Sequence, residues 1–404
     1  MLLVSAGGIG QGVMSMLKSL IAICAGLSVM SLAGCKSGGD AAAQQGGSER
    51  PTFAIALHGG AGVLDKVAPP EEREAYARSL GEALALGVEM LQAGRSALDT
   101  SEAVVMFLEN DPKFNAGRGA VFTAEGRNEL DASIMDGATL KCGAVAGVTT
   151  VKNPIRLARR VMEQTRHVIL SREGAEAFAT TLGPDIARVD PAYFFTEKRW
   201  NVLKEVLGER GEPMPELPKG VTIGGASADR AVIGGGSTDV KVSGTRSTDL
   251  KVSRTYGTVG CVVLDSAGNL AAATSTGGMS GKRWARIGDS PIIGAGNYAN
   301  NESCAVSGTG TGEEFIRHGV ARDISDRMRY KGIGVNQAAR EVVHGVLKPD
   351  DGGVIAVSRT GEIAMVWNSE GMFRAAADSN GRFEVGIWEG LERVGRAAAQ
   401  QNSR

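Results

Sequence analysis

The apolar positions of the chain follow two periods, a continuous one typical of buried strands and a three-to-four spacing typical of helices. "TFAIALHGGAG", residues 52–62, predicts a buried strand that runs into a glycine loop. The acidic opening "PPEEREA" marks the start of a long helix, because carboxylates favour a helix N-terminus. Helical spacing predicts helices at residues 70–94, 101–110, 153–164, 172–181, 191–207 and 334–346.

Glycine turns separate several segments that have strand-like patterns. "FNAGRGAVFTAEG" and "NELDASIMDGATLKCGAVAGVTTV" predict hairpin strands within residues 114–151, and residues 352–376 predict a further hairpin. "SGTGTGEEFIRHG", residues 307–319, predicts a glycine turn that opens a helix. Together with 57 glycines, these segments indicate a sheet-rich enzyme with many tight turns.

A hairpin at residues 258–276 makes the most specific geometric prediction. "TVGCVVLD" and "NLAAATST" are joined by a loop in which Gly268 takes the position that needs a left-handed residue. Pairing Asp265 with Asn269 sets a register that places Thr258 directly opposite Thr276. Opposed side chains lie about 5 Å apart at Cβ, so the two hydroxyls can hydrogen-bond. The alternative is an ordinary Thr–Thr pair of a sheet.

The first residues have the pattern of an export signal rather than of a folded element. An apolar run at residues 20–34 follows Lys18 and ends in "LAGC", which resembles the bacterial lipobox. We therefore expect a lipoprotein-type signal peptide at residues 1–34, lipidation of Cys35, and a polar tether at residues 35–50. Met14 or Met16 would give a more usual start. By resemblance to the Gram-negative sorting rule, Lys36 in place of an Asp favours the outer membrane. The expected product is therefore a periplasmic lipoprotein anchored in the outer membrane. A buried helix with an incidental cysteine is the alternative.

A second change in composition divides the body of the chain. Residues 208–257 are rich in Gly, Ser, Thr and Pro and are expected to form a flexible linker. They include a near-repeat, "STDVKVSGTR" then "STDLKVSRTY", at residues 237–256, which we interpret as linker duplication. A long linker is easily explained if the chain is cut at its end. The expected parts are residues 51–257 and 258–404, whose end frays from Arg393.

The net charge and the spacing of histidines and cysteines argue against several classes of function. The formal net charge is −1, so no nucleic-acid partner is expected. The four histidines have no triad-like or metal-like spacing. A nucleophile without histidine needs another base, and an N-terminal threonine carries its own α-amine. Thr258 is the candidate. Three body cysteines form no zinc pattern and are expected to be small buried residues: Cys142, Cys261 and Cys304.

Two further segments offer groups that could bind an amino-acid substrate. Arg286 presents a fork for a carboxylate, and Asp289 presents an acceptor for an ammonium group. Their three-residue spacing is equally that of a surface ion pair. "SGTGTGEE", residues 307–314, directs backbone N–H groups and threonine hydroxyls to where an oxyanion could develop. A phosphate loop is the competing interpretation, but the run lacks the following Lys-Ser/Thr.

These signals coincide with a known pattern. The motifs "HGGAG", "FNAGRGAVFT", "ELDASIMDG", "GAVAGVTTVKNPI", "GTVGCVVLDSAGNLAAATSTGGM", "RIGDSPIIGAGNYA" and "SGTGTGEEFIR" resemble those of the isoaspartyl peptidase/L-asparaginase family. This family comprises plant-type asparaginases among the N-terminal nucleophile hydrolases. The resemblance covers residues 53–389. It implies an α+β fold, a four-layer αββα sandwich, and a dimer of processed αβ units.

The resemblance also implies roles for individual residues. The precursor would cleave itself between Gly257 and Thr258, and Thr258 would then be nucleophile and base, oriented by Thr276. Its substrate, asparagine or a β-aspartyl dipeptide, would be held at the α-carboxylate by Arg286 and at the α-ammonium by Asp289. The oxyanion hole would consist of Thr309 and Gly310, and the Gly312 backbone would touch the substrate.

No cofactor is implied for the chemistry, but the resemblance implies a structural sodium ion. Backbone carbonyls of the loop at residues 108–118, which contains Asn115, would hold this ion. The carbonyls concerned are those of Leu108, Glu109, Phe114, Ala116 and Arg118. The only expected membrane contact is through the lipid anchor.

The chain departs from the family pattern between "TSTGGM" and "RIGD". It has "SGKRWA" there, whereas relatives usually have Asn at position 281 and Gly at 285, and Trp284 is bulkier than in many relatives. These changes concern the fit of leaving groups. Glycosylasparaginase activity on the same scaffold and a non-enzymatic surface lipoprotein are the alternatives. The sequence leaves open whether asparagine or isoaspartyl dipeptides are preferred.

Overall fold

The computed structural model describes residues 50–62, 69–221 and 257–388. The expected signal peptide, Cys35, most of the tether, the repeat and the tail from Arg393 lie outside these residues. None of the helices within the described ranges is long and apolar enough to cross a membrane.

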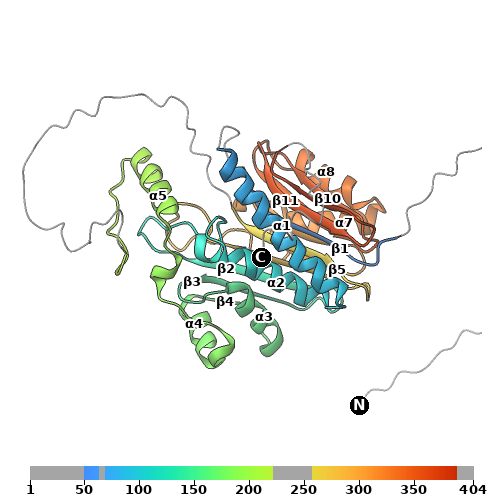
Figure 1. Cartoon of the computed structure of the whole chain (residues 1–404), viewed down its shortest axis with the longest axis horizontal. Coiled ribbons are helices and arrows are strands. Elements are labelled where there is room, and N and C mark those ends of the chain that lie inside the picture. Colours follow the sequence, from blue (N-terminus) through green and yellow to red (C-terminus); the bar gives the residue numbers. More distant parts are fainter. Residues whose placement is uncertain (1–49, 63–68, 222–256, 389–404) are drawn as a thin grey trace, which may run out of the picture. The chain divides into compact units, whose positions relative to one another are not determined.

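The larger of two sheets has eight strands in the order β12-β11-β1-β5-β6-β2-β3-β4 (Figure 1). Its neighbouring strands pair antiparallel except for β3 and β4, which are parallel. Its strands are β1 (Ala54–Ala61), β2 (Leu130–Asp136), β3 (Cys142–Val148), β4 (Ile169–Ser171), β5 (Val259–Leu264), β6 (Leu270–Thr276), β11 (Met372–Asp378) and β12 (Phe383–Gly386).

The second sheet has four antiparallel strands in the order β10-β9-β8-β7. Its strands are β7 (Asn297–Ala299), β8 (Cys304–Gly310), β9 (Gly352–Ser358) and β10 (Ile363–Trp367). The helices are α1 (Pro70–Gln92), α2 (Ala97–Asn110), α3 (Pro154–Gln164), α4 (Arg172–Thr181), α5 (Glu197–Glu209), α6 (Gly312–His318), α7 (Val320–Lys331) and α8 (Val335–Gly345).

Strand β1 is buried along its whole length, and its sequence is apolar except for His58. Successive side chains point to opposite faces of a strand, and both faces of β1 are buried. Ile55 and Leu57 belong to a core shared with α1, α2 and α3, whereas Ala54 and Ala56 belong to a core shared with the second sheet, α7 and α8. Small residues dominate the second face because it meets another sheet. The chain thus has an α+β fold in which β1 contributes to two cores.

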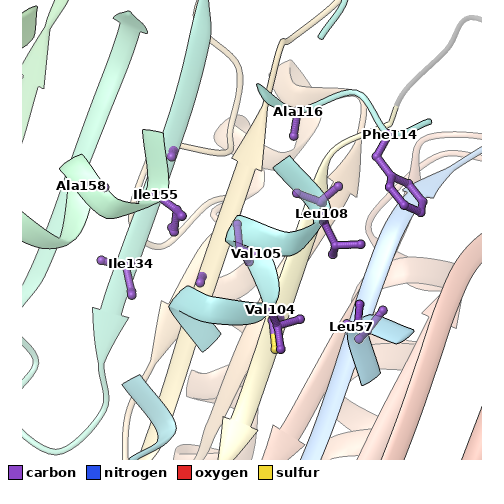
Figure 2. Close-up of a cluster of buried hydrophobic side chains, with 14 of the residues drawn as sticks. Leu57, Val104, Val105, Leu108, Phe114, Ala116, Ile134, Ile155 and Ala158 are labelled. Atoms are coloured by element: carbon purple, nitrogen blue, oxygen red, sulfur yellow. The ribbon is translucent and has the colours of Figure 1, made fainter. Parts of the chain in front are cut away.

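Figure 2 shows the first of these cores in detail. Val104, Val105 and Leu108 of α2 project from one side of the helix. Ile155 of α3 lies near Ile134 of β2 in the same cluster. The three-to-four spacing of the α2 residues is the amphipathic pattern that the sequence shows, so packing against the sheet explains it.

Most predicted helices are confirmed, but two boundaries are wrong. Helix α2 begins at Ala97 rather than at residue 101, because the Ser96 side chain accepts a hydrogen bond from the Asp99 backbone and caps the helix. The helix predicted at residues 191–207 is divided into a 3-10 turn at Pro191–Phe194 and helix α5. A second cap, in which Thr196 accepts from the Arg199 backbone, starts α5 anew.

Some strand predictions are also wrong. Residues 114–126 form a loop with a 3-10 turn at Gly117–Gly119 instead of a strand. Residues 307–310 are the end of strand β8 rather than a turn. The hairpin predicted at residues 352–376 is correct for β9 and β10, but β11 leaves it and pairs with β1 in the larger sheet. These outcomes depend on tertiary pairing, which glycine-rich sequences specify weakly.

The register of the hairpin formed by β5 and β6 is confirmed. Val259 pairs with Ser275 and Leu264 with Leu270, which is the predicted alignment. Gly268 has φ +82°, so the loop uses its glycine in the left-handed region as expected. Two of the three body cysteines, Cys261 and Cys304, are buried as predicted, whereas Cys142 is only half-buried; all three are free thiols.

Asp265, at the turn of this hairpin, ties β5 to the start of helix α2. Its carboxylate accepts hydrogen bonds from the backbone of Ala267 and Asn269 within the turn, at 3.0 and 2.9 Å. Its other oxygen accepts from the Ala97 backbone, the first residue of α2, at 2.9 Å. A buried carboxylate with three N–H partners both sets the turn and satisfies a helix end.

We predict that Asp265→Ala lowers the free energy of unfolding by about 2–4 kcal/mol, because the buried Ala97 N–H and two N–H groups of the turn lose their acceptor. Asp323→Ala, which removes a partly exposed i,i+4 pair with Arg327, should lower it by less than about 1 kcal/mol. Urea denaturation followed by circular dichroism measures both values. Equal effects of the two substitutions would contradict this account of the turn.

Candidate active site

A narrow pocket lies where the hairpin ends meet the loop after β6 and the end of β8. Five residues that the sequence predicts as site residues line it, together with neighbours that the sequence did not indicate. The predicted residues are Thr258, Thr276, Arg286, Asp289 and Gly310. The others are Gly278, Met279, Gly288 and Ser290. The pocket thus brings together residues up to 52 positions apart in the sequence, from Thr258 to Gly310.

The two threonines at the bottom of the hairpin are in direct contact. The Thr258 hydroxyl donates to the Thr276 hydroxyl with an Oγ1–Oγ1 distance of 3.1 Å, and both residues are buried. The Gly278 backbone N–H donates to the same Thr276 oxygen at 3.0 Å. Thr276 therefore holds the Thr258 hydroxyl in one direction, as the predicted register requires.

Asn115 connects the residue before Thr258 to the strand opposite. Its backbone N–H donates to the Gly257 carbonyl at 3.1 Å, and its carbonyl accepts from the Gly277 backbone at 3.0 Å. Its side-chain amide donates to the Gly278 carbonyl at 2.8 Å and accepts from Val121 at 2.9 Å. A Cβ on residue 257 would lie 2.7 Å from the Asn115 Cβ, so only glycine allows this approach.

Arg286 and Asp289 do not form the surface ion pair that their spacing allows. Arg286 instead donates through Nε and Nη2 to both oxygens of Glu313, at 2.9 and 2.8 Å. The sequence did not indicate Glu313 as a site residue. Its place in "TGEE", an acid next to a glycine turn and close to the predicted site residues, was a signal that could have found it. A planar pair of this kind fixes the guanidinium plane and leaves Nη1 free of Glu313.

Asp289 is buried beside Arg286 with one oxygen unpaired. Its Oδ2 atom makes no hydrogen bond within the described residues. Burial raises the pKa of Asp289 to about 7, and the nearby Arg286 charge offsets only part of this. A Cβ on Gly312 would lie 2.9 Å from Asp289 Oδ1 and 2.8 Å from Arg286 Nη2. Gly312 therefore borders both groups, and Asp289, which lines the pocket, keeps a buried acceptor without a partner in the described residues.

Thr309 and Gly310 are the last two residues of β8, and Gly310 lines the same pocket as Thr258. The Thr309 hydroxyl oxygen accepts from the Ala61 backbone at 3.2 Å, which leaves its proton available to a further acceptor. A Cβ on Gly310 would collide with the Asp351 carbonyl, so this residue must be glycine. Gly310 lines the pocket, whereas Thr309, the residue before it, is fully buried and is not a lining residue.

The loop predicted to hold sodium lies beside this site. The carbonyls of Glu109 and Phe114 turn towards Gly117 and Gly119, where a Cβ would collide with them. The two carbonyls approach different glycines, and backbone carbonyls are oxygen donors of the kind that a hard cation binds. The described residues contain no group of three or more His, Cys, Asp or Glu that could hold a metal ion.

The sequence of the chain is similar to proteins of known type. The profile of the family described as asparaginase matches residues 51–387. The probable isoaspartyl peptidase/L-asparaginase 2 of Arabidopsis thaliana is 44% identical over 340 residues, which cover 83% of this chain and 99% of the relative. The isoaspartyl peptidase of Salmonella typhimurium is 45% identical, covering 80% and 94%.

More distant relatives include an animal enzyme. The human isoaspartyl peptidase/L-asparaginase is 36% identical over 337 residues, which cover 82% of this chain and 95% of the relative. The chain belongs to the asparaginase family, and it is a hydrolase of that family. The resemblance inferred from the motifs is confirmed.

The raised pKa of Asp289 generates a prediction on stability. Between pH 4 and 7 the unfolded chain releases this proton while the folded chain keeps it, so stability falls as pH rises through this window and is level above it. Asp289→Asn should abolish that fall, up to about 4 kcal/mol. Urea denaturation of both proteins from pH 4 to 8 measures the difference. A constant difference across the range would show that Asp289 titrates normally.

Proposed function

We propose that the chain is an autocleaving threonine hydrolase that removes β-aspartyl groups from isoaspartyl dipeptides and hydrolyses L-asparagine to aspartate and ammonia. The observation that carries the proposal is the buried Thr258–Thr276 hydroxyl pair, in which Thr258 stands immediately before β5 and Gly257 directly precedes it. The names of the relatives support the substrate class.

The precursor would cut itself at the Gly257–Thr258 peptide bond. The Thr258 hydroxyl attacks the Gly257 carbonyl carbon, the C–N bond breaks, and the proton of the hydroxyl passes to the departing nitrogen. This gives an ester between Gly257 and Thr258 Oγ1, which water hydrolyses to a free carboxylate and a free hydroxyl. The Asn115 N–H already donates to the Gly257 oxygen, where negative charge develops.

The mature enzyme would use the α-amine that the cut creates. An α-amine has a pKa near 8 and can accept the Thr258 hydroxyl proton at neutral pH. The hydroxyl attacks the side-chain carbonyl of the substrate, and the amine passes the proton to the leaving nitrogen. The Thr309 hydroxyl and Gly310 stabilise the oxyanion. Water then hydrolyses the acyl-enzyme, which restores Thr258.

The neighbouring charges determine which carbonyl reaches Thr258. Arg286, held by Glu313, would bind the substrate α-carboxylate, and Asp289 would bind the α-ammonium beside the Gly312 backbone. An ammonium group binds the ionised form of Asp289, so a bound substrate would return its pKa towards the usual range. Anchoring both α-groups leaves the β-carbonyl next to the threonine.

The wider architecture belongs to the same proposal. We infer a four-layer αββα sandwich, because helices share cores with both sheets. We also infer a dimer of processed αβ units. A sodium ion on the carbonyls of Leu108, Glu109, Phe114, Ala116 and Arg118 would stiffen the loop that carries Asn115, and supplies charge but no chemistry of its own.

We predict that Thr258→Ala yields one uncut chain without activity, because both the nucleophile and its amine are lost. The wild type should give two fragments on a denaturing gel and hydrolyse β-Asp-Leu at least about 10⁴ times faster than the variant. Thr360→Ala, on the turn between β9 and β10, is the control and should behave as wild type.

Three substrates distinguish the alternatives. β-Asp-Leu, asparagine and N-glycosylated asparagine are compared with the same wild-type preparation. Preference for the glycosylated substrate would assign the chain to the glycosylasparaginase reaction instead. An uncut wild-type chain without activity on any of the three would indicate a non-enzymatic protein. A Thr258→Ala chain that is still cut and still active would refute the mechanism.

We further propose export of the chain as a periplasmic lipoprotein anchored in the outer membrane by Cys35. The apolar run, the "LAGC" sequence and the polar tether of residues 35–50 support this. The lipid chains would add an apolar anchor to an otherwise folded enzyme.

We predict that protein from a Gram-negative host begins at Cys35 and carries the mass of a diacylglyceryl and acyl group. Cys35→Ser should lose this mass and move from the membrane fraction to the soluble fraction. Intact mass spectrometry and detergent partitioning measure both effects. Cys142→Ser is the matched control. A wild-type chain that retains residues 1–34 would contradict the proposal.

A further inference from the structure

His58 of β1 lies against the backbone of Thr258, outside the groups used above. Its Nδ1 atom is 2.9 Å from the Thr258 carbonyl oxygen, and its Nε2 atom is 2.9 Å from the Ser307 hydroxyl. The side chain is fully buried. The imidazole therefore bridges the residue immediately before β5 of the larger sheet and Ser307 in β8 of the second sheet, next to the candidate nucleophile.

The position of His58 explains why a side chain is needed there. The ladder between β1 and β5 runs from Ala54–Leu264 to His58–Gly260 and ends at that pair. The β1–β11 register shifts between His58 and Gly60. The Thr258 carbonyl lies beyond the last pair, and a buried carbonyl needs a donor. The imidazole supplies the bond that the ladder no longer provides.

The partners of His58 fix the direction of its hydrogen bonds. A carbonyl oxygen only accepts, so Nδ1 carries the proton. Burial lowers the pKa of His58 to about 3, and the neutral ring leaves Nε2 as an acceptor. Ser307 must then donate to Nε2.

The same reasoning extends the chain of hydrogen bonds across the sheets. Thr274 lies 2.7 Å from the Ser307 oxygen and donates to it. Asn297 donates to Thr274 at 3.2 Å and to the Ser133 carbonyl at 3.1 Å. A single direction therefore runs from Asn297 to the Thr258 carbonyl, and each hydroxyl along it has one donor and one acceptor.

Space behind the site is reserved for this arrangement. A Cβ on Gly260 would collide with the Ser307 hydroxyl and would lie 2.5 Å from His58 Nε2. The glycine of "GTVG" is thus required for the bond between His58 and Ser307. The close packing also excludes water as a replacement for the imidazole.

We propose that His58 is a positioning residue, which holds the Thr258 carbonyl and thereby directs the hydroxyl and the α-amine of that residue. The inference rests on the proposed role of Thr258 as nucleophile. Once the chain is cut, Gly257 and its contact with Asn115 belong to the other fragment. A new terminus frays unless it is tied down. Thr276 then fixes the hydroxyl, and His58 fixes the backbone.

Three variants test the proposal. His58→Phe keeps a ring but removes both bonds, whereas His58→Asn keeps an N–H near the position of Nδ1. His167→Phe changes an exposed histidine and is the matched control. We expect His58→Phe to lower kcat for β-Asp-Leu by about 10–100-fold with KM changed less than threefold, because misplacing a reacting group by about 1 Å has such effects.

His58→Asn should recover kcat to within about fivefold of wild type, and His167→Phe should match wild type. A His58→Phe enzyme with wild-type kcat would overturn the proposal, as would equal losses in the Phe and Asn variants. Where His58→Phe does not fold, Ser307→Ala replaces it. Ser307→Ala removes the donor to Nε2 and should therefore lower kcat several-fold with KM unchanged. An unchanged kcat would refute the proposal.

A spectroscopic measurement separates this inference from the proposed function. Nitrogen-15 spectra of histidine-labelled wild type should show His58 neutral and protonated at Nδ1 from pH 5 to 9. An Nε2–H tautomer, or titration near the usual pKa, would overturn the role of His58 whatever the activity. Activity in Thr258→Ala would instead refute the proposed function and leave the tautomer result standing.

Discussion

The register of the β5–β6 hairpin is the constraint on which the site depends. A shift of one residue would turn Thr258 to the other face of the sheet and away from Thr276. Asp265 fixes the turn of the hairpin, and the same carboxylate starts helix α2. The chemistry at one end of the hairpin is therefore set by hydrogen bonds at the other end.

Glycine has a consistent role around the pocket, which is to allow close approach. At positions 257, 260, 310 and 312 a Cβ would meet Asn115, Ser307, Asp351 and the Arg286–Asp289 pair, respectively. These four glycines thus allow backbone to pack densely against functional groups. Side chains that reach the pocket are held from several directions, which preorganises them.

Burial controls the protonation of the polar groups near the site. It raises the pKa of Asp289 to about 7 and lowers that of His58 to about 3, so Asp289 is partly protonated near neutral pH and His58 stays neutral well below it. Asp289 lines the pocket and keeps an oxygen that has no hydrogen-bond partner in the described residues, whereas His58 is hydrogen-bonded on both sides. Asp289 therefore has an acceptor left for a ligand, whereas both ring nitrogens of His58 are used within the protein.

Local sequence signals determined the helices, the hairpin register and the family, because periodicity, turn glycines and ordered motifs are properties of neighbouring residues. The Thr258–Thr276 contact followed from counting along one hairpin. Only the tertiary structure placed Asn115 on the Gly257 carbonyl, Glu313 on Arg286 and His58 on Thr258. It also sent β11 to the larger sheet. These contacts join segments far apart in the chain, where packing of the two sheets, rather than local preference, decides which side chains meet.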